Sequence, residues 1–159
     1  MKLVINSCYG GFHLSPKALK RYLELKGKNT YFYKKTKSEY IDGIDEFTRI
    51  DNIDSIKDDL FIACTTIDYG KVTNIYPSGT FKDRLIPRND KHLIQVVEEL
   101  GEEANTTVSR LIVVEIENGR WYKIDEYDGY ESIEYRDIDD DWELAEDNEI
   151  RNVITSHLS

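Results

Sequence analysis

The sequence predicts an α/β or α+β fold: a mixed β-sheet with two main helices and a C-terminal β-hairpin or meander. Two observations predict this class. Strand-like and helical segments alternate over the first two thirds of the chain, and strand-like segments separated by tight turns follow. No Pro/Gly/Ser-rich linker divides the 159 residues, a length that suits one domain.

The chain opens with the pattern of a strand, a glycine turn and a helix. Residues 2–8 form an apolar run with a β-branched centre, and Gly10-Gly11 follows it. Ser15 and the proline after it supply an N-cap and a first helical residue whose missing N–H costs nothing. We therefore expect a helix over residues 16–26.

Three further segments in the middle of the chain have strand character. Two are short, residues 30–34 and the weaker 46–50. Residues 60–67 form the most hydrophobic stretch, which predicts a central strand covered on both faces. A loop-rich segment, 68–89, comes next, and loops of this length inside a compact domain are often functional.

A second helix and a group of strands are predicted after this loop. Apolar residues at i, i+3, i+4 and i+7 predict a helix that ends at Leu100, capped by Asn89 or Asp90. Asn118-Gly119 is the strongest hairpin signal, and Asp128-Gly129 marks a second turn. The strands expected around these turns are 110–116, 121–127 and 130–135. Of the remaining segments, the acidic run 137–141 is expected to be solvated and 142–158 is expected to form a marginal helix.

The net charge of −10 at pH 7 argues against nonspecific binding to long nucleic acids, because phosphate backbones repel such a surface. The charge is divided unevenly. Residues 1–91 carry 16 Lys/Arg and 12 Asp/Glu, whereas residues 92–159 carry 5 and 19. We therefore expect charge to be polarised across the domain, with a basic side that can attract a small anion.

The composition also points to a reduced, cytoplasmic protein. No apolar run approaches the ~20 residues that a helix needs to cross a bilayer, so we expect no membrane partner. The N-terminus lacks the apolar core and cleavage site of a secretion signal. Two cysteines are too few for a disulfide framework, and Cys8 and Cys64 both lie in apolar runs, which favours buried thiols.

The first candidate ligand site is the segment between the first strand and the first helix. Glycines at such a junction let backbone amides approach a ligand, and the positive end of the helix favours an anion. Neighbouring rings offer a stacking face for a base or sugar. The alternative is a turn that needs a positive φ at Gly10 or Gly11. The candidate residues of this segment are Asn6, Cys8, Tyr9, Gly10, Gly11, Phe12 and His13.

The second candidate is Arg88, which lies just before the second helix. A guanidinium there can clamp a phosphate or carboxylate bidentately, and the alternative is an ion pair with local acids such as Asp90. Asn105 and Asp125 are candidates for bonds to sugar hydroxyls or another polar ligand edge. Tyr127 is a candidate for stacking, and alternation along a strand places it on the same face as Asp125.

No catalytic signature is present in the sequence. Cys8 is close to His13 and to a helix start, but a nucleophile also needs a base within hydrogen-bond reach, so a buried strand cysteine is the favoured interpretation. The three histidines are far apart, and the acidic stretch 125–129 lacks the spacing of a calcium loop. We therefore expect no metal and no other cofactor.

Four blocks of the sequence together resemble a family of small phage-encoded proteins, usually without an assigned function. The blocks are VINSCYGGF at 4–12, IPRND at 86–90, VVEELGEEAN at 96–105 and IDEYDGYE at 124–131. The resemblance implies a single domain over residues 1–136 with a variable insertion at about 36–82. Residues 137–159 then form an acidic extension in which the chain departs from the family.

The resemblance implies a phage accessory protein that acts in the cytoplasm of a bacterial host. Small phage proteins often inhibit host defence, and one strategy is to sequester a nucleotide-derived signalling molecule. We therefore interpret the chain as a binding module for a small phosphate-bearing ligand, with a homo-oligomer left open. Two alternatives also stay open. One is a small enzyme that acts on a nucleotide through Cys8, His13 or Glu126, and the other is an acidic inhibitor that mimics nucleic acid through residues 137–149.

Overall fold

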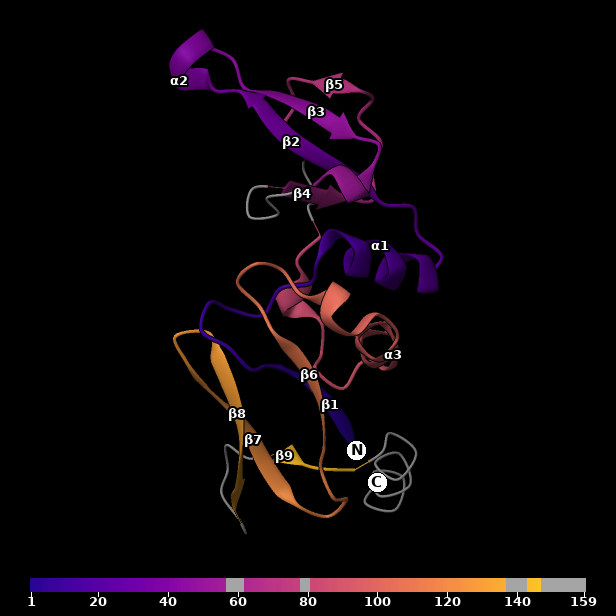
Figure 1. The fold of residues 1–159 in the computed structure, drawn as a ribbon, viewed down its shortest axis with the longest axis vertical. Coiled ribbons are helices and arrows are strands. Elements are labelled where there is room, and N and C mark those ends of the chain that lie inside the picture. Colours follow the sequence, from indigo (N-terminus) through magenta and orange to yellow (C-terminus); the bar gives the residue numbers. More distant parts are fainter. Residues whose placement is uncertain (57–61, 78–80, 137–142, 147–159) are drawn as a thin grey trace, which may run out of the picture.

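The computed structural model describes residues 1–56, 62–77, 81–136 and 143–146. Figure 1 shows an elongated molecule. A four-stranded sheet lies at one end, two helices lie in the middle, and two smaller groups of strands form the other end. The predicted α+β class, with two main helices and a C-terminal hairpin, is confirmed. All pairings between the described strands are antiparallel.

The first strand and the two main helices form where the sequence predicts them. Strand β1 (Lys2–Asn6) pairs with β6 (Leu111–Glu115). Helix α1 (Pro16–Leu25) begins after Ser15, whose side-chain oxygen accepts a hydrogen bond from the Ala18 N–H. Helix α3 (Lys91–Leu100) is capped in the same way by Asp90 and continues into the 3₁₀ turn η3 (Gly101–Ala104).

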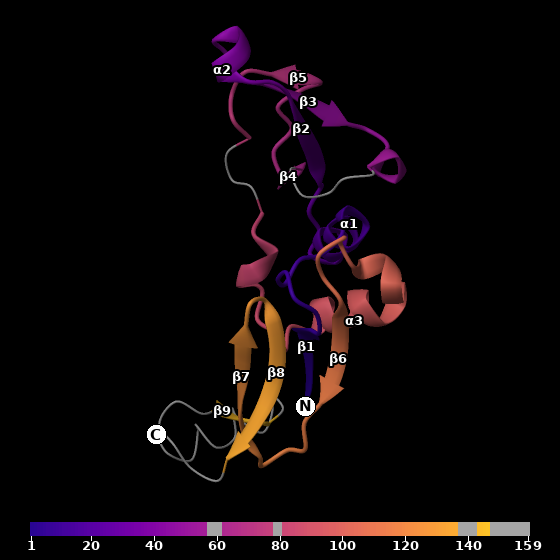
Figure 2. The same ribbon diagram turned by 60° about the vertical axis from the view of Figure 1, so that its left-hand side comes forward.

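The four-stranded sheet has the order β4-β2-β3-β5. Its main strands are β2 (Tyr31–Lys37) and β3 (Glu46–Ile50), joined through the short helix α2 (Glu39–Asp42). The other elements of this region are the edge strands β4 (Ile62–Thr65) and β5 (Val72–Thr73) and the 3₁₀ turns η1 (Ile53–Ser55) and η2 (Asp83–Leu85). Figure 2 shows α2 and β5 both at the outer end of this sheet.

The prediction of a central strand at residues 60–67 is wrong, because β4 is an edge strand; residues 60 and 61 lie outside the described part. The strand with apolar cover on both faces is instead β1. Val4 belongs to the main core, whereas Leu3, which points to the opposite face, belongs to a second core at the far end. Hydrophobicity alone does not reveal whether a strand lies at the edge or in the interior of a sheet.

The third sheet has the order β8-β7-β9, from β7 (Trp121–Tyr127), β8 (Tyr130–Arg136) and β9 (Glu143–Leu144). The predicted turn between β7 and β8 is confirmed. Asp128 and Gly129 both have positive φ, 49° and 84°, as a two-residue hairpin of the tight, primed type requires.

The predicted hairpin at Asn118-Gly119 is wrong, because β6 pairs with β1 whereas β7 pairs with β8 and β9. The chain does turn there, but it passes from one sheet to another. The Gly119 N–H donates to the carbonyl of Ala145, which belongs to the segment after β9. The expected helix over 142–158 is wrong at residues 143–146, because 143–144 are a strand and 145–146 have no helical structure. Its other residues, and the acidic run 137–141, lie outside the described part.

The main core lies between α1, α3, the β1–β6 pair and the nearer end of the four-stranded sheet. Its fully buried side chains include Val4, Ala18, Leu23, Phe32, Leu93 and Val96. The second core is formed by Leu3, Ile116, Tyr122 and Ala145. Among the described residues, no helix is both long and apolar enough to cross a membrane.

The two halves of the sequence bring their opposite charges together between the helices. Lys17 and Arg21 of α1 each lie 3.0 Å from a carboxylate of the α3–η3 segment, Glu103 and Glu99 respectively. Along this helix pair the two kinds of charge are therefore not separated, because a basic and an acidic segment face each other. The sequence shows the charge of each segment but not which segments become neighbours.

Candidate functional site

The glycine segment packs directly against the β7–β8 turn. The Gly10 N–H donates to the carbonyl of Asp128 at 3.1 Å. A Cβ on Gly129 would lie 2.5 Å from the Gly11 nitrogen, and a Cβ on Gly10 would lie 2.2 Å from the carbonyl oxygen of Val108. The glycines therefore let three backbone segments pack closely: Gly10–Gly11, the chain at Val108 and the Asp128–Gly129 turn. Here the glycines serve backbone packing, in place of the predicted contact with a ligand.

Asn6 is the bridge between these stretches. Its side-chain amide donates to the carbonyls of Cys8 and Gly129, at 2.8 and 2.7 Å, and its Oδ1 accepts the Arg110 N–H at 2.8 Å. The residue is fully buried. Its hydrogen-bonding groups are thus used inside the protein, and they fix the loop to the hairpin.

Arg88 is held by protein groups on two sides. Its Nη2 lies 3.0 Å from Oε2 of Glu131, and its guanidinium carbon lies 3.4 Å from the centre of the Phe12 ring. Both partners of the ion pair are largely buried, with 17% and 9% of their side-chain surfaces exposed. The other carboxylate oxygen of Glu131 accepts the Asn6 N–H at 2.8 Å.

This arrangement realises the ion-pair alternative for Arg88, but with a different acid from the one expected. Its partner is Glu131 on β8, not Asp90, which caps α3. In the sequence, alternation along β8 indicates which face of the strand Glu131 is on. It does not indicate that Glu131 pairs with an arginine 43 residues away. Glu131 therefore occupies the Nη2 of Arg88, a donor that a bidentate phosphate clamp would use.

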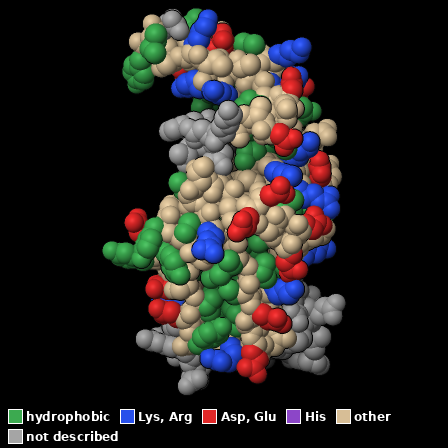
Figure 3. All heavy atoms as spheres, viewed as in Figure 1, with side chains coloured by type: hydrophobic (Ala, Val, Ile, Leu, Met, Phe, Trp, Pro, Cys, Tyr) green, Lys and Arg blue, Asp and Glu red, His purple; other side chains and the backbone are tan. Residues whose placement is uncertain are grey.

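Three exposed tyrosines lie together where the glycine segment meets the hairpin. The rings of Tyr9 and Tyr130 are 5.5 Å apart, and Tyr130 is the direct cross-strand partner of Tyr127. Their exposed fractions are 65%, 40% and 76% in the order Tyr9, Tyr130, Tyr127. We call these three residues the tyrosine tip. Figure 3 shows hydrophobic side chains projecting at this edge of the molecule.

The tip contains two residues that the sequence had identified and one that it had not. Tyr9 and Tyr127 were candidates, and the structure brings them to one place. Tyr130 was not identified, although its position directly after the Asp128-Gly129 turn makes it the partner of Tyr127 in any two-residue hairpin. Asp125, two residues before Tyr127 on β7, lies on the same face of the hairpin and is opposite Ser132.

The immediate surroundings of the tyrosine tip are acidic. Asp125, Glu126 and Asp128 are exposed and lie within the last residues of β7 and the turn. One Glu126 carboxylate oxygen accepts the Gly129 N–H, which holds the turn. The tip therefore combines aromatic rings with carboxylates. The guanidinium of Arg88, the candidate phosphate ligand, is already paired with Glu131.

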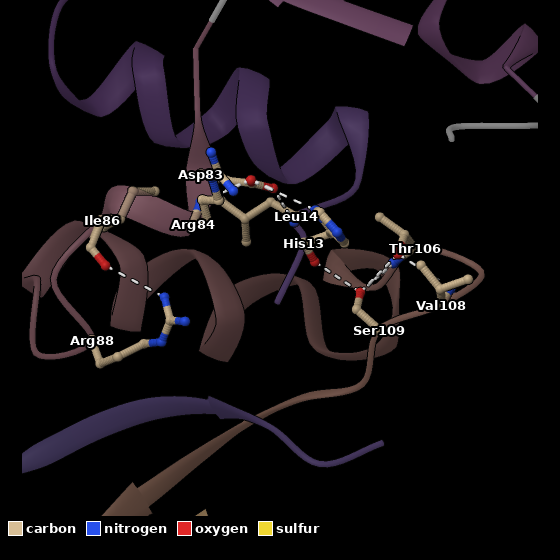
Figure 4. A network of polar contacts seen from close by, with 9 residues as sticks. All are labelled: His13, Leu14, Asp83, Arg84, Ile86, Arg88, Thr106, Val108 and Ser109. Carbon is tan, nitrogen blue, oxygen red and sulfur yellow. Dashed lines mark hydrogen bonds and ion pairs between the residues drawn. The ribbon is translucent and has the colours of Figure 1, made fainter. Parts of the chain in front are cut away.

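His13 belongs to a separate polar network on the other side of the loop (Figure 4). Its Nδ1 lies 3.7 Å from Asp83, whose second oxygen accepts the Leu14 N–H at 2.7 Å. Ser109 donates to the backbone carbonyl of His13, not to its imidazole. A serine, a histidine and an aspartate thus lie close together. The serine hydroxyl bonds to a backbone carbonyl and not to the imidazole that would take its proton, so the serine is not an activated nucleophile.

The remaining candidates are in structural positions. The Sγ of Cys8 lies 3.5 Å from two oxygens, Asn6 Oδ1 and the Val108 carbonyl, neither of which is a base that could take its proton. Asn105 Oδ1 accepts the Leu111 N–H at 2.7 Å and so fixes the start of β6. Phe12 is buried in the main core, beneath the Arg88 guanidinium.

Comparison with known proteins does not extend these observations, because no protein-family model, curated protein or solved structure matches the chain. Within the described residues, no group of three or more His, Cys, Asp and Glu side chains is placed to hold a metal ion.

Proposed function

We propose that this chain is a non-catalytic binding protein and that the tyrosine tip is its contact surface. The supporting observation is that three exposed tyrosines are contiguous. The loop and the hairpin that carry them are joined by hydrogen bonds of Asn6 to Glu131 and to the Gly129 carbonyl. Tyrosine offers a large amphipathic area with few rotatable bonds, so little entropy is lost when it is covered. Tyrosine is also enriched among the residues that dominate binding energies.

The partner that fits this surface is a protein with a basic surface. Asp125 lies on the same face of the hairpin as Tyr127, Glu126 and Asp128 are the residues on either side of Tyr127, and the chain has a net charge of −10. Such a surface repels anions and steers cationic partners toward it. Together with the resemblance to phage proteins, this favours an inhibitor of a bacterial defence protein, the acidic-inhibitor alternative, acting through the hairpin rather than through residues 137–149.

Sequestration of a nucleotide-derived signalling molecule is the second candidate. It is favoured by one observation: the exposed rings stand beside Asp125 and Ser132, which face the same side of the hairpin. A base can stack on a tyrosine for about 1–3 kcal/mol, while the carboxylate and hydroxyl bind sugar hydroxyls. The phosphate has no comparable support, since Arg88 is paired with Glu131.

Site-specific photo-cross-linking tests the first candidate. A photoreactive phenylalanine analogue replaces Tyr127, and a matched control carries it at Leu85, which is equally exposed but lies on η2. In bacterial cells we expect a basic protein to be cross-linked from position 127 only. Replacing Tyr9 and Tyr130 together by serine should lower the yield at least tenfold. Salt at about 1 M, where the Debye length is about 3 Å, should also lower it.

Thermal unfolding with nucleotides tests the second candidate. A nucleotide at ~100 times its dissociation constant should add about 2.7 kcal/mol of stability, and Tyr127→Ser should remove that gain. Chromatography of the recovered nucleotide separates a binding protein, which returns it intact, from an enzyme. If neither a cross-link above the Leu85 control nor a nucleotide-dependent shift is found, the tyrosine tip is not a contact surface.

A further inference from the structure

A second exposed apolar surface lies at the outer end of the four-stranded sheet, away from the tyrosine tip. It is formed by two segments, the α2 region and the chain that follows β5. Its members are Tyr40, Ile41, Ile44, Ile75 and Tyr76, and we call them the apolar end. Tyr40 and Ile41 are 99% and 82% exposed, and the other three are more than half exposed.

Strand pairing brings the two segments together. Because β5 is antiparallel to β3, with Val72 opposite Thr48 and Thr73 opposite Phe47, the chain that leaves β5 runs back toward the start of β3. There the Tyr76 ring meets the Phe47 ring edge-on, with 5.2 Å between centroids. Figures 1 and 2 both place α2 and β5 at the outer end of this sheet, and Figure 3 shows hydrophobic side chains at this end.

The α2 region is anchored rather than loose. The Asp45 carboxylate accepts the Glu39 N–H at 2.7 Å and pairs with Lys35 at 3.2 Å. The hydrogen bond from the Glu39 N–H lowers the pKa of the Asp45 carboxyl most, and the contact with Lys35 lowers it further. The Gly43 N–H closes the helix on the Glu39 carbonyl, with Gly43 at a φ of 76°. The exposed apolar side chains are therefore presented on a fixed support.

The charges next to the apolar end nearly balance, because residues 34–46 contain three lysines and four acidic residues. Two of these lysines are paired within the sheet. Lys35 lies 3.2 Å from Asp45, and Lys37 lies 3.8 Å from Glu46. The surplus of negative charge belongs to residues 92–159, which carry 19 acidic and 5 basic side chains, and the described strands of that part lie at the other end of the molecule (Figure 1). Two copies with net charges of −10 can therefore approach each other at the apolar end with the least repulsion.

We propose that the apolar end is the interface of a homodimer, in which a second copy of this chain covers the same surface about a two-fold axis. The two tyrosines, 99% and 62% exposed, alone expose roughly 240–400 Å², since a fully exposed aromatic side chain offers about 150–250 Å². With the three isoleucines, the patch reaches the size of about 300–600 Å² that marks functional surfaces on monomers. Covering it on both copies, with its rim, brings the buried area to about the 1,200 Å² at which specific interfaces begin. A surface that is apolar and locally neutral is complementary to itself, as a two-fold contact requires.

Sedimentation equilibrium of the full chain tests the proposal, over about 1 µM to about 1 mM so that a weak dimer is included. We expect a monomer–dimer equilibrium whose dissociation constant rises at least tenfold in Ile41→Asp. Leu85→Asp, which introduces the same charge at an exposed apolar residue of η2, is the matched control and should leave the constant unchanged. Circular dichroism confirms that both variants stay folded.

A cysteine cross-link locates the contact independently. Ile41 is 82% exposed, so Ile41→Cys should form a disulfide-linked dimer under mild oxidation, whereas Leu85→Cys, on η2, should not. A monomer throughout the concentration range would overturn the proposal. A dimer that Ile41→Asp does not weaken would also overturn it. The outcome is independent of whether the tyrosine tip binds a ligand.

Discussion

Replacing Glu131 by alanine should destabilise the fold by about 3–5 kcal/mol, the cost of leaving one partner of a buried ion pair alone. The Arg88 guanidinium, whose side chain is 17% exposed, would lose its carboxylate contact at 3.0 Å. The Asn6 N–H would lose its acceptor at 2.8 Å, and a buried unsatisfied donor by itself costs about 1–3 kcal/mol. The cation–π contact of Arg88 with Phe12 remains, which keeps the loss from being larger.

Urea unfolding followed by circular dichroism measures this loss. With a slope of about 1–3 kcal/mol per molar urea, the midpoint should fall by at least about 1 M. The control is Glu103→Ala, which breaks the half-exposed pair with Lys17 and should cost less than about 1 kcal/mol. The double variant Arg88→Met/Glu131→Leu should cost less than Glu131→Ala, because it removes both charges together. Equal losses for Glu131→Ala and Glu103→Ala would refute the assignment of Arg88–Glu131 as the bond that fixes the hairpin.

Two further perturbations test the packing of the same region and of the core. Gly129→Ala places a Cβ 2.5 Å from the Gly11 nitrogen, whereas Gly119→Ala, at a similar positive φ, meets nothing within 4 Å. Unfolding measurements should therefore show Gly129→Ala to be about 1–3 kcal/mol more destabilising than Gly119→Ala, and equal effects would contradict the close approach. Burial raises the pKa of the Cys64 thiol to about 12, so at pH 8 it stays protonated and unreactive in the folded protein. A disulfide reagent should accordingly modify only the partly exposed Cys8 until denaturant is added, and rapid modification of both thiols would contradict the burial of Cys64.

Local signals in the sequence predicted the elements of this fold well. Ser15 and Asp90 cap α1 and α3 as expected, because an N-cap depends on a side chain and the amides two or three residues after it. The β7–β8 turn was predictable for the same reason, since Asp128-Gly129 provides both positive φ values. These features depend on neighbours in the chain and not on the rest of the fold.

Pairing between distant segments was not predictable in this way. The glycine at position 119 supports a turn, yet β6 pairs with β1, more than 100 residues away in the sequence. The hydrophobicity of residues 60–67 suggested a central strand, yet strand order depends on which partners are present, and β4 became an edge. Local sequence patterns indicate which face of a strand is buried, but they do not specify which other strand it pairs with.

The candidate site shows the same division. By itself, the sequence determined a glycine junction before a capped helix, an arginine before the next helix, and aromatic and acidic residues around a tight turn. Only the tertiary structure determined how these groups are used: Glu131 neutralises Arg88, Asn6 joins the loop to the hairpin, and Tyr130 completes the tyrosine tip. The physical reason is that the orientation of a buried charge or amide is set by desolvation and by the partners available within hydrogen-bond distance, which come from remote parts of the chain.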